Sequence, residues 1–380
     1  MRLALIDPSN NPMTTNLPMA TFLIRVYNDE RYIAAAIESA LAQTLSDIEV
    51  IVVDDGSTDS SREIIRLLAR RDPRVRIFEG EHRGMVYPLN LGLRLARSKY
   101  ICILDADDIA MPDRVDKQVK FLEEHNGYAL VAGQVMEIDQ DGQIIASKSS
   151  PLTDKEIKAS LKRTCCLTHS AVMFRREDVI ELGGYDPLFP PAEDYDLWVR
   201  LAQKHQLGSL TDIVCQYRVH GNQATSSKIS RQSFAAMCSR ASFRGVKREL
   251  IRDSVQADTK DYPCTLRRLG FSNDEIAEGM FATYIHWVGL LRSIGRREGA
   301  VRLLGEATQL MLEWRCAPRY LARLYSLEFL LALDVRDYMR ASGFLLRALF
   351  ISPAETMRRI SGKLFRTFSS RQNVARTALG

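Results

Sequence analysis

The stretch IEVIVVDDGSTDSS, residues 48–61, joins a short apolar run to a polar turn and the start of a helical pattern. Its first six residues are almost continuously apolar, as expected for a strand that is buried on both faces of a sheet. Gly56 permits a tight turn, and the hydroxyl and acidic residues after it can cap a helix. The stretch therefore predicts a strand that ends at two adjacent aspartates and leads directly into a helix.

The same alternation of strand and helix patterns continues on both sides of this stretch. Further strands are expected at 20–26, 75–78 and 100–104, with helical patterns between them. Repeated β-α-β units with buried strands predict the α/β class, with a mostly parallel sheet covered by helices. Ligands of such sheets bind at the carboxyl ends of the strands, so we expect the functional residues there.

The domain organisation follows from the length and from a change in texture after residue 221. The 380 residues are enough for two or three domains, and beyond 221 the patterns are almost wholly helical. We expect an N-terminal extension at 1–19, the α/β domain at 20–225 and a helical region with a basic tail at 226–380.

Composition and charge exclude several classes of protein. An apolar fraction of 46% and a charged fraction of 26% are typical of a soluble globular protein and exclude wholesale disorder, collagen and a coiled-coil rod. The net charge of +5 does not indicate a nucleic-acid partner. Seven basic residues and one acidic residue lie within 342–380, which defines the basic tail.

Cysteine usage and hydropathy indicate the compartment. The seven cysteines are odd in number and show no C-x-x-C spacing, which favours a reducing cytosol over a disulfide framework or a zinc site. No run of 18 uncharged apolar residues occurs, so we expect no spanning helix. Any membrane contact would then be peripheral, on the inner face of the plasma membrane.

Acidic residues follow two of the predicted strands. Asp54 and Asp55 are adjacent after one strand and need a cation or hydrogen-bond donors between them. Receiver domains of signalling proteins, which hold magnesium, also have such a pair. Asp105 and Asp107 follow a second strand, where an extended chain would point both to the same side to share one divalent cation or ligand hydroxyls. The chain continues for more than 270 residues after them, which favours a metal-and-ligand site over a receiver domain.

Two later segments carry further candidate residues. Glu193 and Asp194 begin a predicted helix, where acids commonly complement the helix dipole. His220 follows a β-like run in YRVHGN, and a lone histidine is more often a structural hydrogen-bonding group than a metal ligand. From the residues alone, both structural and functional roles stay open.

The ordered combination of these segments resembles glycosyltransferase family 2, the inverting sugar-nucleotide enzymes of GT-A fold. The resemblance covers about 205 residues and rests on motifs that each are weak alone. They are, in order, YNDERYIAAAIESALAQT, IEVIVVDDGSTDSS, LNLGLRLARSKYICILDADDIAMPDRV, HSAVMFRRE with GGYDP, AEDYDLWVRL and YRVHGN. The resemblance implies a GT-A nucleotide-sugar-binding domain, Rossmann-like in its sheet.

Site roles follow from the resemblance, residue by residue. Asp194 matches the catalytic base, and Asp107 with His220 match the metal ligands. Donor contacts are expected from six residues: Asp55 at the nucleotide base, Asp105 near the ribose, and also Tyr27, Glu193, Arg25 and Arg83. The two arginines enter because Arg25 and Val26 stand where the family usually has a proline and a small hydroxyl residue, and Leu89 stands where an arginine is common.

These roles imply a metal-dependent hexosyltransferase that uses Mn²⁺ or Mg²⁺, given the oxygen-rich ligands. It would move a sugar, most often from a UDP-sugar in this family, to a glycan or lipid-linked acceptor with inversion, as in surface polysaccharide biosynthesis. Two alternatives stay open. A sugar nucleotidyltransferase would normally show a glycine-rich phosphate loop after the first strand, which RVYNDE does not provide. A glycan-binding or scaffolding member of the same fold would have no use for the full set of acids.

Overall fold

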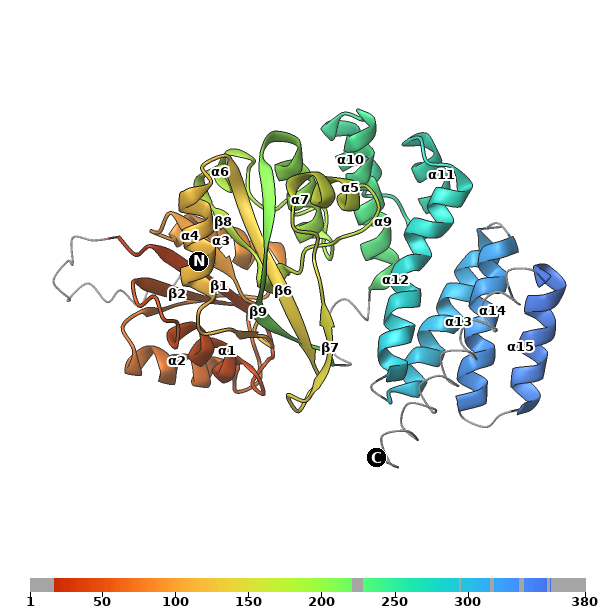
Figure 1. The fold of residues 1–380 in the computed structure, drawn as a ribbon, viewed down its shortest axis with the longest axis horizontal. Coiled ribbons are helices and arrows are strands. Elements are labelled where there is room, and N and C mark those ends of the chain that lie inside the picture. The colour runs from red at the N-terminus through yellow and green to blue at the C-terminus, as the bar shows by residue number, and fades with distance from the viewer. Residues whose placement is uncertain are drawn as a thin grey trace, which may run out of the picture. The chain divides into compact units, whose positions relative to one another are not determined.

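The structure, a computed structural model, describes residues 17–220, 228–293, 295–314, 318–334, 338–353 and 356. One sheet of nine strands organises the first part of the chain (Figure 1). The strands are β1 (Ala20–Val26), β2 (Ile48–Asp54), β3 (Val75–Glu79), β4 (Tyr100–Ile103), β5 (Ile109–Ala110), β6 (Tyr128–Ile138), β7 (Ile144–Lys148), β8 (Met173–Arg175) and β9 (Gln206–Arg218).

The sheet is parallel from β3 to β4, at one end, and mixed in the remainder. Its order is β3-β2-β1-β4-β8-β6-β9-β5, and β7 pairs with β6 outside this path. The pairs β1–β2, β2–β3, β1–β4 and β6–β9 are parallel, whereas β8 runs antiparallel to both of its neighbours. The predicted α/β class with a mostly parallel sheet is confirmed.

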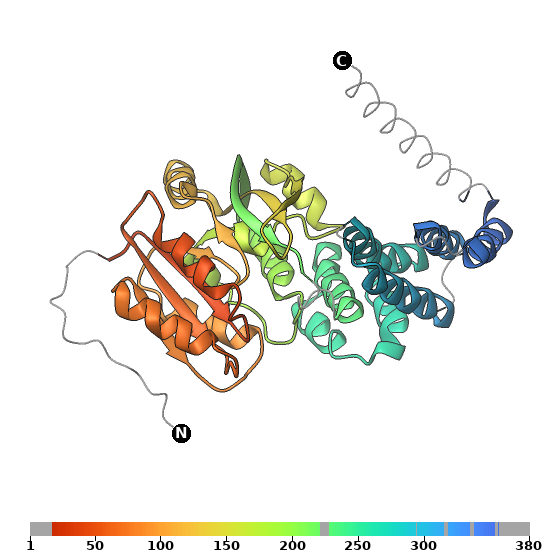
Figure 2. The same cartoon turned by 90° about the horizontal axis from the view of Figure 1, so that it is seen from below.

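Helices cover the sheet as the nearly continuous apolar strands require. They are α1 (Ile33–Leu41), α2 (Ser61–Arg71), α3 (Val86–Leu95), α4 (Arg114–Glu124), α5 (Asp154–Leu161), α6 (Arg176–Glu181) and α7 (Glu193–Lys204). Figure 2 shows α1 and α2 in front of the strands, on one face of the sheet. Successive residues of β1 serve opposite faces, because Phe22 packs with α1 while Leu23 contacts Gly92 of α3.

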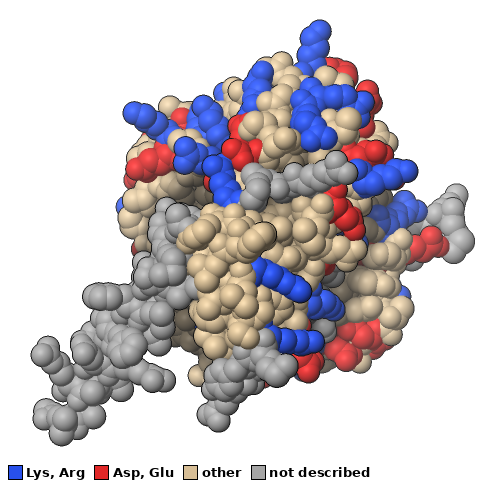
Figure 3. All heavy atoms as spheres, turned by 90° about the vertical axis from the view of Figure 1, so that its right-hand side faces the viewer, with Lys and Arg blue, Asp and Glu red and all other residues tan. Residues whose placement is uncertain are grey.

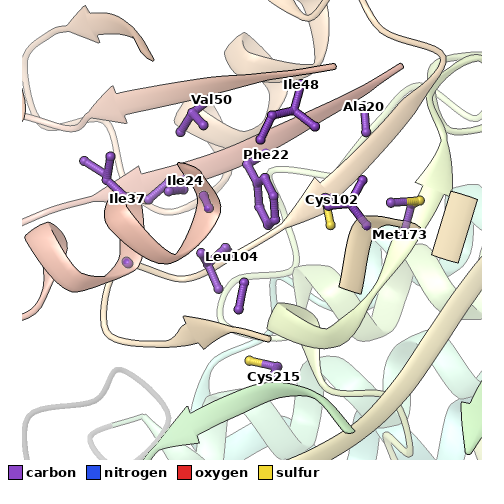
Figure 4. Packing of buried hydrophobic residues seen from close by; sticks show 14 of the residues in the cluster. Ala20, Phe22, Ile24, Ile37, Ile48, Val50, Cys102, Leu104, Met173 and Cys215 are labelled. Carbon is purple, nitrogen blue, oxygen red and sulfur yellow. The ribbon is translucent and has the colours of Figure 1, made fainter. Parts of the chain in front are cut away.

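The main apolar core lies between the sheet and the helices α1, α2 and α4. In Figure 4, Phe22 and Ile24 of β1 lie near Ile37 of α1, with Cys102 and Leu104 close by. All of these side chains are fully buried. This packing fixes the central strands, so that their carboxyl ends form a rigid edge on which polar side chains can be placed.

From residue 228 onward, the described part of the chain is helical, as predicted. Contacts divide the molecule into one unit of Met1–Gln256 and a second of Ala257–Gly380. The first includes α9 (Ile229–Arg240), the 3-10 turn η2 (Ala241–Arg244) and α10 (Arg248–Ser254). The second contains α11 (Tyr262–Arg268), α12 (Asn273–Ser293), α13 (Arg297–Glu313), α14 (Pro318–Asp334) and α15 (Tyr338–Ile351). The domain limits expected from the sequence, with a boundary after residue 225, refer to functional domains and stay a prediction. By contacts, the first unit continues through α10.

Charge and hydropathy bear on membrane contact. On the face that Figure 3 presents, Lys and Arg side chains are interspersed with Asp and Glu around an uncharged area. Among the described residues, no helix combines the length and apolar character needed to cross a bilayer. Most of the predicted basic tail, from residue 357 onward, lies outside the described residues.

Candidate active site at the carboxyl edge of the sheet

The central parallel strands end together and bring distant parts of the sequence to one edge. Val26 at the end of β1 is in register with Asp54 at the end of β2. On the other side of β1, Leu23 is in register with Ile103, the last residue of β4. Arg25 and Asp105 consequently become neighbours, as the switch point of an open α/β sheet requires.

The two adjacent aspartates after β2 have separate partners. Asp54 is buried and accepts hydrogen bonds from Arg62 of α2 at 2.6 and 2.9 Å. Asp55 turns toward another loop and accepts the backbone N–H groups of Arg83 at 2.8 Å and Gly84 at 2.9 Å. Each of the two carboxylates therefore has its own hydrogen-bond donors, as the sequence required. Asp54 is structural, and Asp55 fixes the loop at 81–84.

Aromatic and cationic side chains flank Asp55. The rings of Tyr27 and His82 are tilted by 33° with centroids 4.2 Å apart, and His82 Nδ1 lies 2.9 Å from Asp55 Oδ2. Arg83 lies over the Tyr87 ring at 4.7 Å. Tyr27 is 44% exposed, so a flat ligand can reach an aromatic surface beside a carboxylate. The predicted donor-side residues Tyr27, Asp55 and Arg83 are thus brought together.

Gly56 is needed for the approach of these two loops. Its φ of +82° is one that residues with a side chain rarely adopt, and a Cβ there would lie 2.6 Å from the backbone nitrogen of His82. The glycine lets the turn after β2 touch the loop that Asp55 holds.

Asp105 is the centre of a dense set of contacts. Its carboxylate accepts a hydrogen bond from Ser170 Oγ at 3.1 Å and lies 3.4 Å from His169 Nδ1 and 3.6 Å from Arg25 Nε. Burial opposes ionisation of Asp105, but His169, Arg25 and Ser170 together lower its pKa. Burial likewise opposes the charged form of His169, yet the negative charge of Asp105 raises its pKa. Asp105 is therefore an anion that is stabilised by three neighbouring side chains.

The chain after β4 turns instead of continuing as the extended segment that we expected. The N–H of Asp108 donates to the carbonyl of Asp105 at 3.2 Å, which closes a turn over Ala106 and Asp107. Asp105 and Asp107 consequently have different partners. Asp107 Oδ2 lies 2.9 Å from Nε2 of His220, so the turn pairs Asp107 with the histidine that follows β9.

Asp108, the third acid of LDADD, supports the turn. Its Oδ1 accepts the backbone N–H of Arg218 at 2.7 Å, and the Arg218 guanidinium donates to the Asp107 carbonyl at 2.8 Å. Burial and the charges of Asp107 and Asp105 raise the pKa of Asp108 well above its usual value. Asp108 therefore acts as a buried structural group that ties β9 to the turn.

Asp107 and His220 suit a divalent cation. A carboxylate oxygen and an imidazole nitrogen 2.9 Å apart can serve as two ligand atoms for Mn²⁺ or Mg²⁺. No group of three or more His, Cys, Asp or Glu with metal-binding geometry occurs among the described residues. A cation held by two protein ligands would take further oxygens from water and from a phosphate-bearing ligand, which is the usual way in which Mg²⁺ binds. The donor set fits the expected metal.

Glu193 and Asp194 form the first turn of α7. Glu193 is 3% exposed, and its Oε2 has no hydrogen-bond partner in the part of the chain that the structure describes. Burial raises the pKa of Glu193, an effect that Arg25 opposes and Asp194 strengthens. Asp194 Oδ1 accepts the N–H of Tyr195 at 2.6 Å, and burial raises the pKa of Asp194 despite the positive field of His169. Asp194 is thus a more effective proton acceptor than an exposed aspartate.

Arg25 links the donor-side acids to those of α7. Burial alone would lower its pKa, but Asp105, Glu193, Asp107 and Asp194 together raise it. The guanidinium is therefore a permanent cation that lies beside Asp105 and within the electrostatic field of three further carboxylates. The structure brings together Arg25, Asp105, Glu193 and Asp194 on one side, and Asp107 with His220 on the other.

Our sequence reasoning assigned no role to His169 and Tyr185. His169 Nε2 lies 3.0 Å from the Tyr185 hydroxyl, while its Nδ1 faces Asp105. Tyr185 is itself held by Asn90, which exchanges two hydrogen bonds with the Tyr185 backbone at 2.8 and 2.9 Å. The signal was present in HSAVMFRRE and GGYDP, but it contributed only to the resemblance.

Comparisons with known proteins indicate the family of the chain. Residues 21–183 match the model of glycosyl transferase family 2. An uncharacterised glycosyltransferase of Methanocaldococcus jannaschii is 31% identical over 220 residues, which cover 57% of this chain and 76% of that protein. Chondroitin synthase of Escherichia coli is 29% identical over 217 residues, which cover 57% of this chain but 31% of the synthase.

A solved structure has the same fold. Residues 1–349 of S. aureus TarS, in complex with UDP-GlcNAc, superpose with a TM-score of 0.52 at 17% sequence identity. The alignment covers 87% of this chain and 91% of that one. At this identity the likeness concerns the fold alone, and it agrees with the GT-A architecture.

Proposed function

Because the chain belongs to glycosyltransferase family 2, we propose that it moves a sugar from a nucleotide-sugar donor to a hydroxyl of a glycan or lipid-linked acceptor, with inversion. The observation that carries the proposal is the position of Arg25. This one cation faces the carboxylate of Asp105, on the donor side, and that of Asp194, at the start of α7. The proximity of these groups supports the proposal that donor binding and proton transfer take place at one site.

The donor is proposed to lie along the carboxyl edge of the sheet. Its base would stack on the exposed ring of Tyr27 beside Asp55, and its ribose would approach Asp105. Arg25 and Arg83 would supply positive charge near the diphosphate. Glu193 would accept a hydrogen bond from a hydroxyl of the donor sugar. We favour a UDP-sugar because the family resemblance makes it the commonest donor.

Asp194 is the proposed general base. Oδ1 is engaged by the N–H of Tyr195, and Oδ2 makes no hydrogen bond with the described residues, so Oδ2 would take the proton of the acceptor hydroxyl. The acceptor oxygen then bonds to the anomeric carbon as the bond from that carbon to the diphosphate oxygen breaks. A single displacement of this kind inverts the configuration. Positioned proton transfer contributes roughly 10²- to 10⁴-fold to such a rate.

Asp107 and His220 are the proposed holders of Mn²⁺ or Mg²⁺. When bound, the cation would neutralise the charge that develops on the diphosphate. Arg218 and Asp108 keep the two ligands together by fixing the turn to β9. Chondroitin synthase and the hyaluronan synthase of Pasteurella multocida are relatives whose names support a glycan as the acceptor.

We also propose that the protein works in the cytosol, in peripheral contact with the inner face of the plasma membrane. The described cysteines are all free, as expected in a reducing compartment. At the start of the basic tail, α15 exposes Leu346 by 68% and Phe350 by 93%. Apolar side chains beside a cluster of basic residues are suited to the membrane interface.

A thermal-shift screen tests the proposal. UDP-, GDP- and dTDP-sugars are added with and without Mn²⁺, since a ligand at a hundredfold excess over its Kd stabilises the folded state by about 2.7 kcal/mol. We expect UDP-sugars to raise the melting temperature in the presence of Mn²⁺ and to release UDP slowly on incubation. If no nucleotide sugar shifts the melting temperature and none is turned over, the proposed activity is wrong.

A further inference from the structure

We infer that Arg248 of α10 is a positioning residue for Asp194, so that the segment 228–256 completes the catalytic site. This inference rests on the proposed function of Asp194. The segment lies beyond residues 21–183, which match the family model, and beyond the stretch that carries the sequence resemblance. Its helices nevertheless belong to the first unit, and α9 packs directly against α7 (Figure 1).

The key contact joins Arg248 to Asp196. Asp196 is fully buried and lies two residues after Asp194, the proposed base. Arg248 donates to both carboxylate oxygens of Asp196, at 2.6 and 2.9 Å. Asp196 also accepts from Arg200 Nε at 2.8 Å and from Ser239 Oγ at 2.9 Å. A carboxylate has about four acceptor positions, so the four donors satisfy Asp196 completely. The first turn of α7 is therefore fixed by a bidentate arginine from α10.

The same guanidinium holds the loop that leads into α7. Arg248 donates to Asp186 Oδ2 at 2.7 Å and lies 4.5 Å from the centre of the buried Phe189 ring. Arg200 donates to the carbonyl of Gly184 at 2.8 Å from the other side. The loop before the base and the helix that carries it are thus tied to one side chain.

Side chains of α9 also form hydrogen bonds with the loop before α7. Arg231 donates to the carbonyl of Leu188 at 3.0 Å, and Gln232 to that of Pro191 at 3.0 Å. Each bond from α9 reaches a backbone carbonyl within three to six residues of Asp194, so the segment sets the path of the chain. Arg248 is the member of this set that contacts both the loop and the helix.

A lysine variant separates geometry from charge. Arg248→Lys keeps a cation beside the buried Asp196 but cannot form the bidentate pair or reach Asp186 at the same time. Arg252→Gln is the matched control, because Arg252 lies on the same helix, its side chain is 48% exposed, and its guanidinium forms an ion pair with Asp186 at 3.2 Å. Arg248→Met, which leaves Asp196 without its counter-ion, serves to gauge the cost of losing the charge.

The experiment uses the full chain and three readouts: hydrogen exchange of residues 185–198, Kd for UDP with Mn²⁺, and kcat for UDP release from a UDP-sugar. For Arg248→Lys we expect faster exchange at 185–198, an unchanged Kd and a kcat lower by about tenfold or more, since small misplacements of a catalytic group are costly. Arg252→Gln should match the wild type in all three.

Two results overturn the inference. One is exchange at 185–198 in Arg248→Lys that equals the wild type, which can be read even in a protein without measurable turnover. The other is faster exchange with an unchanged kcat. A wild-type protein that neither binds nor turns over any of the UDP-, GDP- and dTDP-sugars instead refutes the proposed function, and the exchange data still decide whether Arg248 fixes α7.

Discussion

The guanidinium of Arg25 lies 3.6 Å from the carboxylate of Asp105, and these residues come from neighbouring parallel strands that end at the same edge. The pair places a permanent cation at this edge of the sheet, at a position where the family pattern has no charged residue. Its field reaches Glu193 and Asp194 on α7. The cation would therefore influence both the proposed donor binding and the proton affinity of Asp194, the proposed base.

Replacing Arg25 should change the pH dependence of transfer. Burial raises the pKa of Asp194 and the charge of Arg25 opposes this effect. Arg25→Met removes the opposing charge, so the pKa of Asp194 rises further and the rate reaches its plateau at a higher pH. The measurement is kcat between pH 5 and 9. Arg31→Met, which removes an exposed cation paired with Asp141, is the control, and an identical profile in both variants would exclude the influence of Arg25.

Asp194→Asn should abolish most of the transfer without affecting the fold. The amide cannot accept the acceptor's proton, so we expect kcat to fall by at least about a hundredfold. The melting temperature and the Kd for UDP with Mn²⁺ should stay near the wild-type values. Glu181→Gln, at an exposed acid that pairs with Lys204, is the matched control. Unchanged turnover in Asp194→Asn would remove this residue from the mechanism.

Asp107→Ala should weaken the dependence of donor binding on Mn²⁺, and His220→Ala should do so less. The carboxylate supplies charge as well as a donor atom, whereas the neutral imidazole supplies only a donor atom. Calorimetric titration of UDP at several Mn²⁺ concentrations measures the effect. If the wild type and both variants give the same Mn²⁺ dependence, these residues do not hold the metal.

Glu328 should make the helical unit less stable as the pH rises. Burial raises its pKa to about 7, although Thr308 and Arg347 oppose this shift. Between about pH 4.3, the usual value, and pH 7, the unfolded chain releases the proton while the folded one keeps it, so the free energy of unfolding falls with rising pH. Glu328→Gln should therefore raise the melting temperature at pH 8 and have less effect at pH 5. Exposed Glu313→Gln is the control, and equal shifts at both pH values would contradict the prediction.

The tail should bind anionic membranes. Residues 354–380 carry six basic residues and one acidic residue, and each cation near an anionic leaflet contributes about 1 kcal/mol. The full chain should sediment with phosphatidylserine vesicles at low salt and be released at high salt. A chain truncated after Pro353, which keeps α15 whole but loses six basic residues, should sediment much less than the full chain. Equal sedimentation of the two proteins would show that residues 354–380 of the tail are not an anchor.

The sequence predicted the edge of the sheet better than the contacts across it. The strand that ends at Asp54 was evident from its continuous apolar run, and the parallel order placed Asp105 nearby. The contacts of Asp105 with His169 and of Asp196 with Arg248 were not predictable, because they join residues 64 and 52 positions apart that no local pattern relates. The turn at Asp107 was missed for a different reason, since alternation of side chains holds only while the strand continues.

The place of β9 in the sheet has a consequence for how the protein is made. β9 lies beside β6 along the full length of β6, although 67 residues separate the end of one from the start of the other. On the ribosome, β6 emerges long before β9 and presents an open row of backbone donors and acceptors that a neighbouring chain can pair with. Fragments that end near residue 183, where the family match stops, would keep that exposed edge and should aggregate. Production of the catalytic unit at reduced temperature, where synthesis and self-association are both slower, favours the pairing of β6 with its own β9.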